Sequence, residues 1–220
     1  MKCIEAIFFD AGGILYNIPQ KEIPSLVAFL NEKKIDSPSV FEIREKTKEL
    51  RYNAKIGIIS RTSLYEAILD ECNVFSDSLR QEGYEVMMKT SANINLLEGV
   101  PETLKILKER GLKLGVITNS IIPSNTKKKW LKQRGVDISW DVFVSSVELG
   151  FRKPEPEIYL YAIKQVGVLA KHSVFVGHSP DELIGAKNIG MLTLSLNADS
   201  DIMTDFNISH FAALNYVLDY

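Results

Sequence analysis

Four short apolar segments, each bounded by turn-forming residues, constrain this sequence more than any other feature. They are rich in Val, Ile and Phe and comprise residues 3–9, 113–117, 142–145 and 173–176, with residues 191–196 as a candidate fifth. Continuous apolar runs of this length are typical of parallel strands buried on both faces. Helical patterns lie between them, such as Val100, Leu104 and Leu107 before Gly111. This alternation predicts an α/β fold with a doubly wound, Rossmann-like parallel sheet.

Residues 18–96 interrupt the alternation and show only helical periodicity, as in Ile23, Leu26, Val27 and Leu30. Pro38, Gly57 and Gly83 are expected to separate the helices, and Ser60 is expected to begin one. The pattern therefore predicts two domains. Residues 1–17 and 97–220 form the α/β core domain, and residues 18–96 form an all-helical cap inserted after the first strand.

The balance of charge excludes several classes of partner. The 220 residues include 26 Lys and Arg against 28 Asp and Glu, which gives a formal net charge of -2. No field of one sign is available to hold a nucleic acid or an anionic membrane, so neither partner is expected. The basic run Lys127-Lys128-Lys129 is interpreted as the solvated face of a helix.

The cysteines and the first residues indicate the compartment. Cys3 and Cys72 are far apart and form no CxxC pair, so both are expected to be reduced and buried thiols. The apolar run that opens the chain is too short for a signal peptide or a membrane span. We therefore expect a cytoplasmic protein, and its oligomeric state is left open.

Polar residues follow each predicted strand. Asp10 follows the first, Thr118 and Asn119 the second, Lys153 the third, and residues 177–182 the fourth. Because the carboxyl ends of parallel strands lie at one edge of a sheet, where ligands bind, these side chains are expected to share one cleft. A carboxylate, a hydroxyl with an amide, an ammonium and a glycine-led loop are thereby brought together.

Four segments carry a resemblance to a known family. They are Phe8-Phe9-Asp10-Ala11-Gly12-Gly13-Ile14-Leu15, Val116-Ile117-Thr118-Asn119-Ser120, Lys153-Pro154-Glu155-Pro156-Glu157-Ile158-Tyr159, and Val174-Phe175-Val176-Gly177-His178-Ser179 followed by residues 185–191. In this order they resemble the motifs of the haloacid dehalogenase-like (HAD) hydrolase superfamily, most of whose members are phosphatases. The resemblance covers almost the whole chain, including the helical cap.

The resemblance implies roles for three side chains. Asp10 would attack the substrate and form a covalent intermediate, as carboxylate nucleophiles do elsewhere. Thr118 would hold phosphoryl oxygens, and Lys153 would neutralise both the nucleophile and the developing charge. An opposite charge within about 4–6 Å keeps such a carboxylate ionised. The implied substrate is a small phosphorylated molecule.

The resemblance also implies a binding loop and a cation. The backbone around Asn119, with Gly12 and Gly13, would bind the substrate. In phosphatases of this family, Mg²⁺ bridges the nucleophile, the backbone carbonyl two residues on and an acidic side chain of the last motif. Those ligands would be Asp10, the carbonyl of Gly12, and Glu182, because Mg²⁺ or a similar divalent cation prefers oxygen ligands.

The sequence departs from the family pattern at two positions. Gly12 stands where these phosphatases usually carry a second Asp, the general acid, whose assistance is typically worth about 10²–10⁴-fold. Its loss should affect alkyl phosphates more than acyl or aryl phosphates. His178 stands where the metal-binding Asp is usual, and imidazole is a poor ligand for Mg²⁺. Asp181 or Glu182 could supply the missing oxygen, and we expect Glu182 to face the cleft.

Three functions are therefore compared. The first is a phosphomonoester phosphatase that acts through an aspartyl-phosphate on Asp10. The second is a metal-independent 2-haloacid dehalogenase, which needs no general acid and would hold halide with a cap arginine, Arg44 or Arg51. The third is a catalytically degenerate anion-binding or regulatory protein. For the third function, retention of Asp10, Thr118 and Lys153 argues for an anionic ligand at the strand edge.

Overall fold

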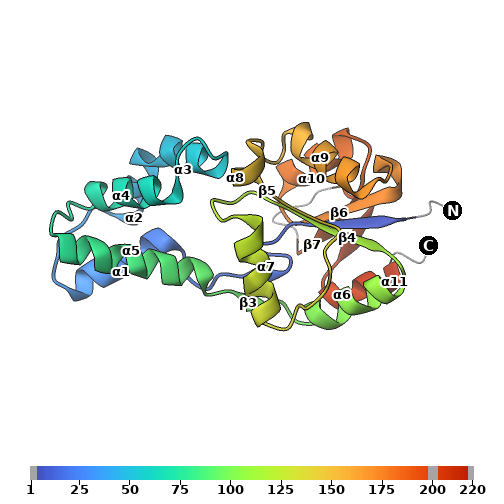
Figure 1. Cartoon of the computed structure of the whole chain (residues 1–220), viewed down its shortest axis with the longest axis horizontal. Coiled ribbons are helices and arrows are strands. Elements are labelled where there is room, and N and C mark those ends of the chain that lie inside the picture. The colour runs from blue at the N-terminus through green and yellow to red at the C-terminus, as the bar shows by residue number, and fades with distance from the viewer. Residues whose placement is uncertain (1–3, 198–202, 218–220) are drawn as a thin grey trace. The chain divides into compact units, whose positions relative to one another are not determined.

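The computed structural model describes residues 4–197 and 203–217 (Figure 1). The chain divides into two compact units, one of residues 1–17 and 96–220 and the other of residues 18–95. Cys3 lies outside the described residues, whereas Cys72 is a buried free thiol. Every helix in the described part of the chain is too short or too polar to cross a membrane.

The first unit is built on a six-stranded parallel sheet. Its order is β5-β4-β1-β6-β7-β8. The central strand β1 therefore has β4 and β5 on one side and β6, β7 and β8 on the other. The strands are β1 (Ala6–Phe9), β4 (Lys113–Thr118), β5 (Val142–Ser145), β6 (Ser173–Gly177), β7 (Leu192–Leu196) and β8 (Phe206–Ile208). This arrangement confirms the predicted doubly wound sheet and places a topological switch point at the end of β1.

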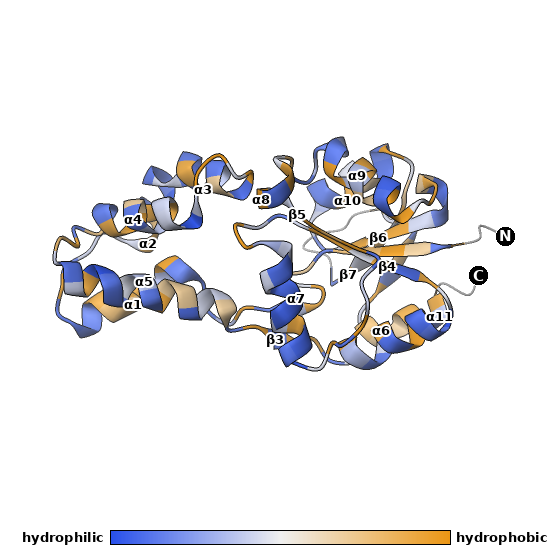
Figure 2. Cartoon of the chain, in the orientation of Figure 1, coloured by the Kyte–Doolittle hydropathy of each residue, from blue (hydrophilic) through white to orange (hydrophobic). Residues whose placement is uncertain are grey.

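Helices cover both faces of this sheet. On one face lie α9 (Pro156–Val166) and α10 (Pro180–Asn188), and on the other lie α6 (Val100–Glu109) and α11 (Leu214–Val217) (Figure 1). The unit also contains α7 (Ser124–Gln133), α8 (Ser146–Leu149) and two short 3₁₀ turns, η1 (Ala170–His172) and η2 (Phe211–Ala213). Figure 2 shows apolar strands between helices that carry both polar and apolar residues, as expected for a sheet buried on both faces.

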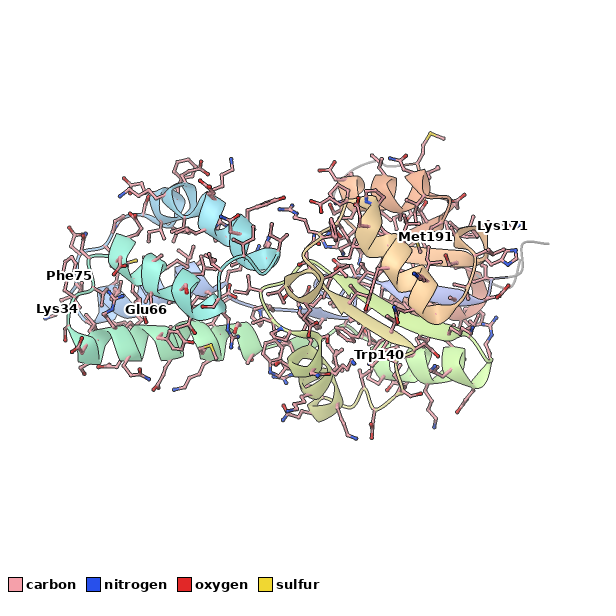
Figure 3. All side chains as sticks on the ribbon, turned by 45° about the horizontal axis from the view of Figure 1, so that its top comes forward. Lys34, Glu66, Phe75, Trp140, Lys171 and Met191 are labelled. Carbon is pink, nitrogen blue, oxygen red and sulfur yellow. The ribbon has the colours of Figure 1, made fainter. Side chains whose placement is uncertain are left out.

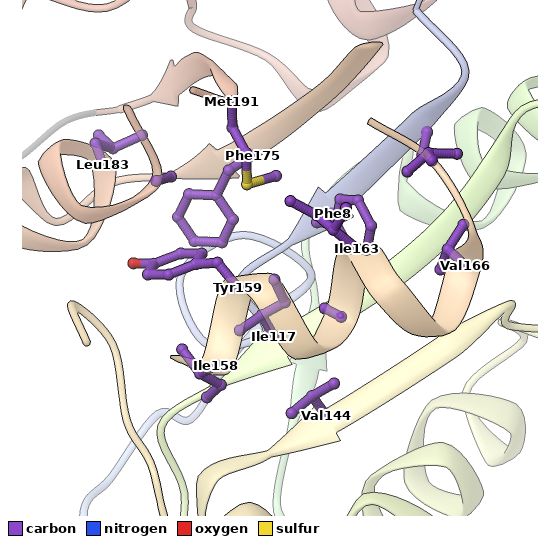
Figure 4. Packing of buried hydrophobic residues seen from close by; sticks show 14 residues of the cluster. Phe8, Ile117, Val144, Ile158, Tyr159, Ile163, Val166, Phe175, Leu183 and Met191 are labelled. Atoms are coloured by element: carbon purple, nitrogen blue, oxygen red, sulfur yellow. The ribbon is translucent and has the colours of Figure 1, made fainter. Parts of the chain in front are cut away.

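The core between the sheet and α9 fixes the carboxyl edge of the strands. Phe8, Phe175 and Tyr159 are fully buried there, within a larger apolar cluster (Figure 4). The rings of Tyr159 and Phe175 meet edge to face, with centroids 5.4 Å apart. Each fully buried apolar side chain of this size contributes about 1.5–3 kcal/mol. The packing therefore gives the strand ends a rigid support.

The second unit consists of five helices. They are α1 (Glu22–Glu32), α2 (Val40–Lys46), α3 (Lys48–Lys55), α4 (Arg61–Glu71) and α5 (Asp77–Ala92). Ser39 and Glu42 form a capping box at the start of α2, and Ser60 caps α4. Arg80 of α5 is paired with Glu66 of α4, a residue labelled in Figure 3. The helical character predicted for this stretch agrees with these elements.

Two details of the predicted cap are wrong. Gly83 lies inside α5 and does not separate helices. Glycine is needed at this position because an added Cβ would come within 2.9 Å of Leu69 and 3.0 Å of Leu26. Its missing side chain lets α5 pack closely against α1 and α4. The stretch also does not end as a helix, since β3 (Asn95–Leu96) pairs with β2 (Tyr16–Asn17) in a small two-stranded sheet.

Candidate active site

Asp10 lies at the switch point of the sheet, directly after β1. Its backbone N–H donates to the carbonyl of Val176 at 2.9 Å, which continues the ladder between β1 and β6 beyond the last strand residue. One carboxylate oxygen, Oδ1, accepts a hydrogen bond from the N–H of Ala11 at 2.8 Å. The side chain is largely buried, and its direction is set by the central strand.

A buried lysine joins two carboxylates at this edge. Lys153 Nζ lies 2.7 Å from Asp10 Oδ1 and 2.6 Å from Glu182 Oε2, and the lysine side chain is fully buried. Burial by itself lowers the pKa of Lys153, but the two carboxylates outweigh it and raise the pKa above its ordinary value. The ammonium is therefore a fixed positive charge beside Asp10.

Glu182 belongs to the first turn of α10 and faces Lys153. Only 16% of its side chain is exposed. Burial, together with the charge of Asp10, raises the pKa of Glu182 against the opposing effect of Lys153. The hydroxyl of Tyr159 donates to the main-chain carbonyl of Glu182 at 2.7 Å, so the core holds this turn in place. The neighbouring Asp181 is exposed.

The side chain of Asn119 holds the lysine segment. Its Nδ2 donates to the carbonyl of Lys153 at 2.9 Å, and its Oδ1 accepts from the N–H of Lys153 at 2.8 Å. Nδ2 also lies 3.2 Å from Glu182 Oε1. The amide therefore positions Lys153 and Glu182, the two partners of the ion pair.

Thr118 is the last residue of β4, which neighbours β1 in the sheet. Three buried serines fix the loop that follows it. Ser146 Oγ accepts from the N–H of Ser120 at 2.9 Å, and Ser145 Oγ donates to the carbonyl of Ile122 at 2.8 Å. These bonds hold the backbone that follows Thr118 in one conformation.

His178 and the two glycines lie on the other side of Asp10. His178 Nε2 is 3.8 Å from Asp10 Oδ2. A Cβ built on Gly13 would lie 2.8 Å from the same nitrogen, so the imidazole ring rests against that glycine, whose φ is +80°. A Cβ on Gly12 would meet nothing within 4 Å. A side chain would therefore be obstructed at Gly13 but would have room at Gly12, in the loop that follows Asp10.

Lys127 is a site neighbour that sequence reasoning missed. The interpretation of this residue as part of a solvated helix face is wrong, because only 6% of Lys127 is exposed and its Nζ donates to the hydroxyl of Tyr16 at 2.6 Å. Burial and the charge of Asp10 raise the pKa of Tyr16. A signal was present: Lys127 precedes the buried Leu131 by four residues, so both lie on one face of α7.

The side chains at this edge do not fit a Mg²⁺ site. Mg²⁺ needs near-octahedral oxygen ligands at about 2.0–2.1 Å. Asp10 Oδ1 and Glu182 Oε2 are both held by Lys153, and Asp10 Oδ2 faces an imidazole. Within the described ranges, no three His, Cys, Asp or Glu side chains gather in a cluster that could hold a metal ion.

Comparisons with known proteins agree with the motifs. The model of the haloacid dehalogenase-like hydrolase family matches residues 4–190. A glyceraldehyde 3-phosphate phosphatase of Methanocaldococcus jannaschii is 33% identical over 96% of this chain and 95% of its own length. A protein of the same name from Methanothermobacter thermautotrophicus is 38% identical over 89% of this chain and 87% of its own. The family resemblance inferred from the four motifs is confirmed.

Solved structures show the same fold. A 2-haloacid dehalogenase of Pseudomonas syringae pv. Tomato superposes with a TM-score of 0.69 at 24% identity, over 96% of both chains. A HAD hydrolase of Bacillus subtilis bound to magnesium superposes with a TM-score of 0.70 at 20% identity, over the full length of both. A HAD phosphatase of Thermococcus onnurineus also superposes, with a TM-score of 0.68 at 22% identity over 98% of both chains. A phosphatase and a dehalogenase therefore share this architecture, and the side chains must decide between their chemistries.

Proposed function

This chain belongs to the haloacid dehalogenase-like hydrolase family, and on that premise we propose that it hydrolyses a small phosphomonoester through an aspartyl-phosphate on Asp10. The ion pair of Asp10 with the fully buried Lys153 carries the proposal. It supplies a carboxylate nucleophile with a buried cation beside it at the switch point of the sheet. The relatives named glyceraldehyde 3-phosphate phosphatase support a phosphorylated three-carbon compound as the first substrate to test.

In the first step, a carboxylate oxygen of Asp10 attacks phosphorus. The new bond from Asp10 to phosphorus forms as the ester P–O bond breaks, and the leaving oxygen takes a proton from water. Lys153 offsets charge on the phosphoryl oxygens, and the backbone after Thr118 donates hydrogen bonds to them. The loop after Thr118 is held in advance by the bond from the N–H of Ser120 to Ser146 Oγ, and the Lys153 segment is held by Asn119.

In the second step, water attacks the phosphorus of the acyl phosphate. The bond between phosphorus and the Asp10 oxygen breaks, the carboxylate is restored, and phosphate leaves with the oxygen and protons of the water. Lys153 again offsets the charge, because it pairs with the carboxylate that is released. Gly12 offers no proton to the first leaving group, so alkyl phosphates should react more slowly than aryl or acyl phosphates.

The test is phosphate release from glyceraldehyde 3-phosphate, p-nitrophenyl phosphate and acetyl phosphate. We expect release from at least one, and a loss of at least about 10³-fold in Asp10→Asn, which removes the nucleophile. Retained binding of inorganic phosphate by this variant would show that its site is intact. Equal rates of phosphate release by the wild type and Asp10→Asn would contradict the proposal. No release by the wild type from any of the three substrates would favour an anion-binding role.

A second candidate, the 2-haloacid dehalogenase, is favoured by one observation. The two carboxylate oxygens of Glu182 already have partners in Lys153 and Asn119, without a metal. Expulsion of halide also needs no proton donor, and Gly12 has no side chain to supply one. The guanidinium of Arg51 donates to the carbonyl of Arg44 at 2.9 Å, which ties up one of its donors. Release of chloride from 2-chloropropionate without phosphate release would select this function.

A further inference from the structure

We propose that this site works without a divalent cation and that the imidazole ring of His178 occupies the place beside Asp10 that a cation would take. The inference deepens the proposed function and rests on it in taking Asp10 as the nucleophile.

The first observation concerns the two oxygens of Asp10. Oδ1 is engaged by Lys153 at 2.7 Å and by the N–H of Ala11 at 2.8 Å. Oδ2 faces His178 Nε2 at 3.8 Å. A bound Mg²⁺ keeps several waters in a near-octahedral shell of about 2.0–2.1 Å radius. An ion lying between Oδ2 and the ring would therefore have the imidazole nitrogen as a ligand in place of a water, and imidazole is a poor ligand for Mg²⁺.

The second observation concerns the ring itself. A Cβ on Gly13 would come within 2.8 Å of Nε2, 2.9 Å of Cδ2 and 3.4 Å of Cε1 of His178. The ring edge therefore lies directly against the backbone of the loop that follows the nucleophile. Glycine at this position lets the imidazole approach so closely, and the ring fills the space between that loop and Asp10.

The third observation concerns Glu182, the other carboxylate of the implied metal site. Oε2 lies 2.6 Å from Lys153 Nζ, and Oε1 accepts from Asn119. Each oxygen could bind a metal only through its second lone pair, and a cation placed there would repel the buried ammonium of Lys153. The carboxylate is therefore committed to positioning Lys153.

Lys153 and His178 together replace the function of the cation. Lys153 supplies the fixed charge on one side of Asp10, and His178 presents a nitrogen on the other side. An imidazole N–H there can donate to a phosphoryl oxygen that a metal would otherwise bind. His178 is thus assigned as a substrate-binding residue of a cation-independent hydrolase.

The test is titration of the full chain with Mn²⁺, followed calorimetrically and by the electron paramagnetic resonance of free Mn²⁺. We expect no saturable binding by the wild type. His178→Asp replaces the ring with a carboxylate next to Asp10 and should gain one Mn²⁺ site, at least roughly tenfold tighter than any binding by the wild type. His210→Asp is the matched control, because it adds the same carboxylate at an exposed position outside the site.

Phosphate release supplies a second readout, with the wild type expected to be indifferent to chelator. Stoichiometric binding of Mn²⁺ by the wild type, or loss of its activity in chelator with recovery in Mg²⁺, would overturn the inference. Failure of His178→Asp to bind Mn²⁺ better than His210→Asp would also overturn it. An absence of phosphate release under all conditions would instead count against the proposed function, and the binding titrations would still decide the inference.

Discussion

The ammonium of Lys127 lies 2.6 Å from the hydroxyl oxygen of Tyr16 and 5.4 Å from the centre of its ring. The two distances place the ammonium in the plane of the ring, beyond the hydroxyl, and both side chains are buried, so this hydrogen bond stabilises a charge that has little access to water. Tyr16 follows the loop that begins at Asp10, and Lys127 belongs to α7. The pair therefore links the loop after Asp10 to the helix that follows Thr118.

Lys127→Met should lower the free energy of unfolding by about 1–3 kcal/mol, because it removes the donor to a buried hydroxyl. Lys129→Met, at an exposed position of the same helix, should change it by less than about 0.5 kcal/mol. Urea denaturation measures both. Adding Tyr16→Phe to Lys127→Met should recover part of the loss, and equal effects of the two lysine substitutions would contradict the pairing.

Gly13→Ala and Gly12→Ala should differ in stability although the residues are neighbours. Gly13 has a φ of +80°, and its Cβ would meet the ring of His178, whereas a Cβ on Gly12 meets nothing within 4 Å. A left-handed conformation costs a non-glycine residue about 1–2 kcal/mol, and displacement of the ring adds to that cost. Thermal unfolding should rank Gly13→Ala clearly below Gly12→Ala. The reverse order would show that the ring does not rest on this loop.

Lys153→Met should be among the most destabilising substitutions in the chain. It leaves the buried carboxylates of Asp10 and Glu182 without their shared cation, and breaking a buried pair in this way costs about 3–5 kcal/mol. Glu182→Gln alone should cost less, since Asp10 still balances the lysine. In the double variant, Glu182→Gln should offset part of the loss, and a cycle of urea denaturation curves gives the coupling. Additive effects would argue against an interaction.

The sheet could be predicted from the sequence because strands buried on both faces are continuous apolar runs. Their order along the chain then limits the possible topologies. The contact between Lys153 and Asp10 was predictable for a related reason, since the carboxyl ends of parallel strands lie at the same edge of the sheet. The closeness of His178 to Gly13 was not predictable, because a side chain's direction in a loop depends on local φ and ψ. Gly83 was misread because its close helix contacts involve residues far away in sequence.

Asp141 should contribute an acid-sensitive part of the stability. Burial by itself raises its pKa, but Lys108 and the N–H of Leu114 together lower the pKa below its usual 3.8. A carboxyl whose pKa is lower in the folded state stabilises the fold above its ordinary pKa and loses that contribution as pH falls through the folded value. Asp141→Asn should therefore be less stable than the wild type at pH near 7. Urea denaturation should show the difference shrinking at pH below 3.8, and a constant difference would exclude the linkage.

Gly12→Asp should restore a proton donor and raise activity selectively. The position has room for a side chain, since a Cβ there meets nothing within 4 Å, and it lies two residues after Asp10. General acid assistance is worth about 10²–10⁴-fold when the donor is well placed, and it matters most for poor leaving groups. We expect kcat on glyceraldehyde 3-phosphate to rise by at least about tenfold, with little change on p-nitrophenyl phosphate, whose leaving group is stable without a proton.

Gly12→Asn has nearly the same size and no acidic proton, so it is the matched control. A rise of equal size on both substrates, or a rise in Gly12→Asn as well, would mean that the gain comes from binding or loop order and that proton transfer to the leaving oxygen does not limit this enzyme.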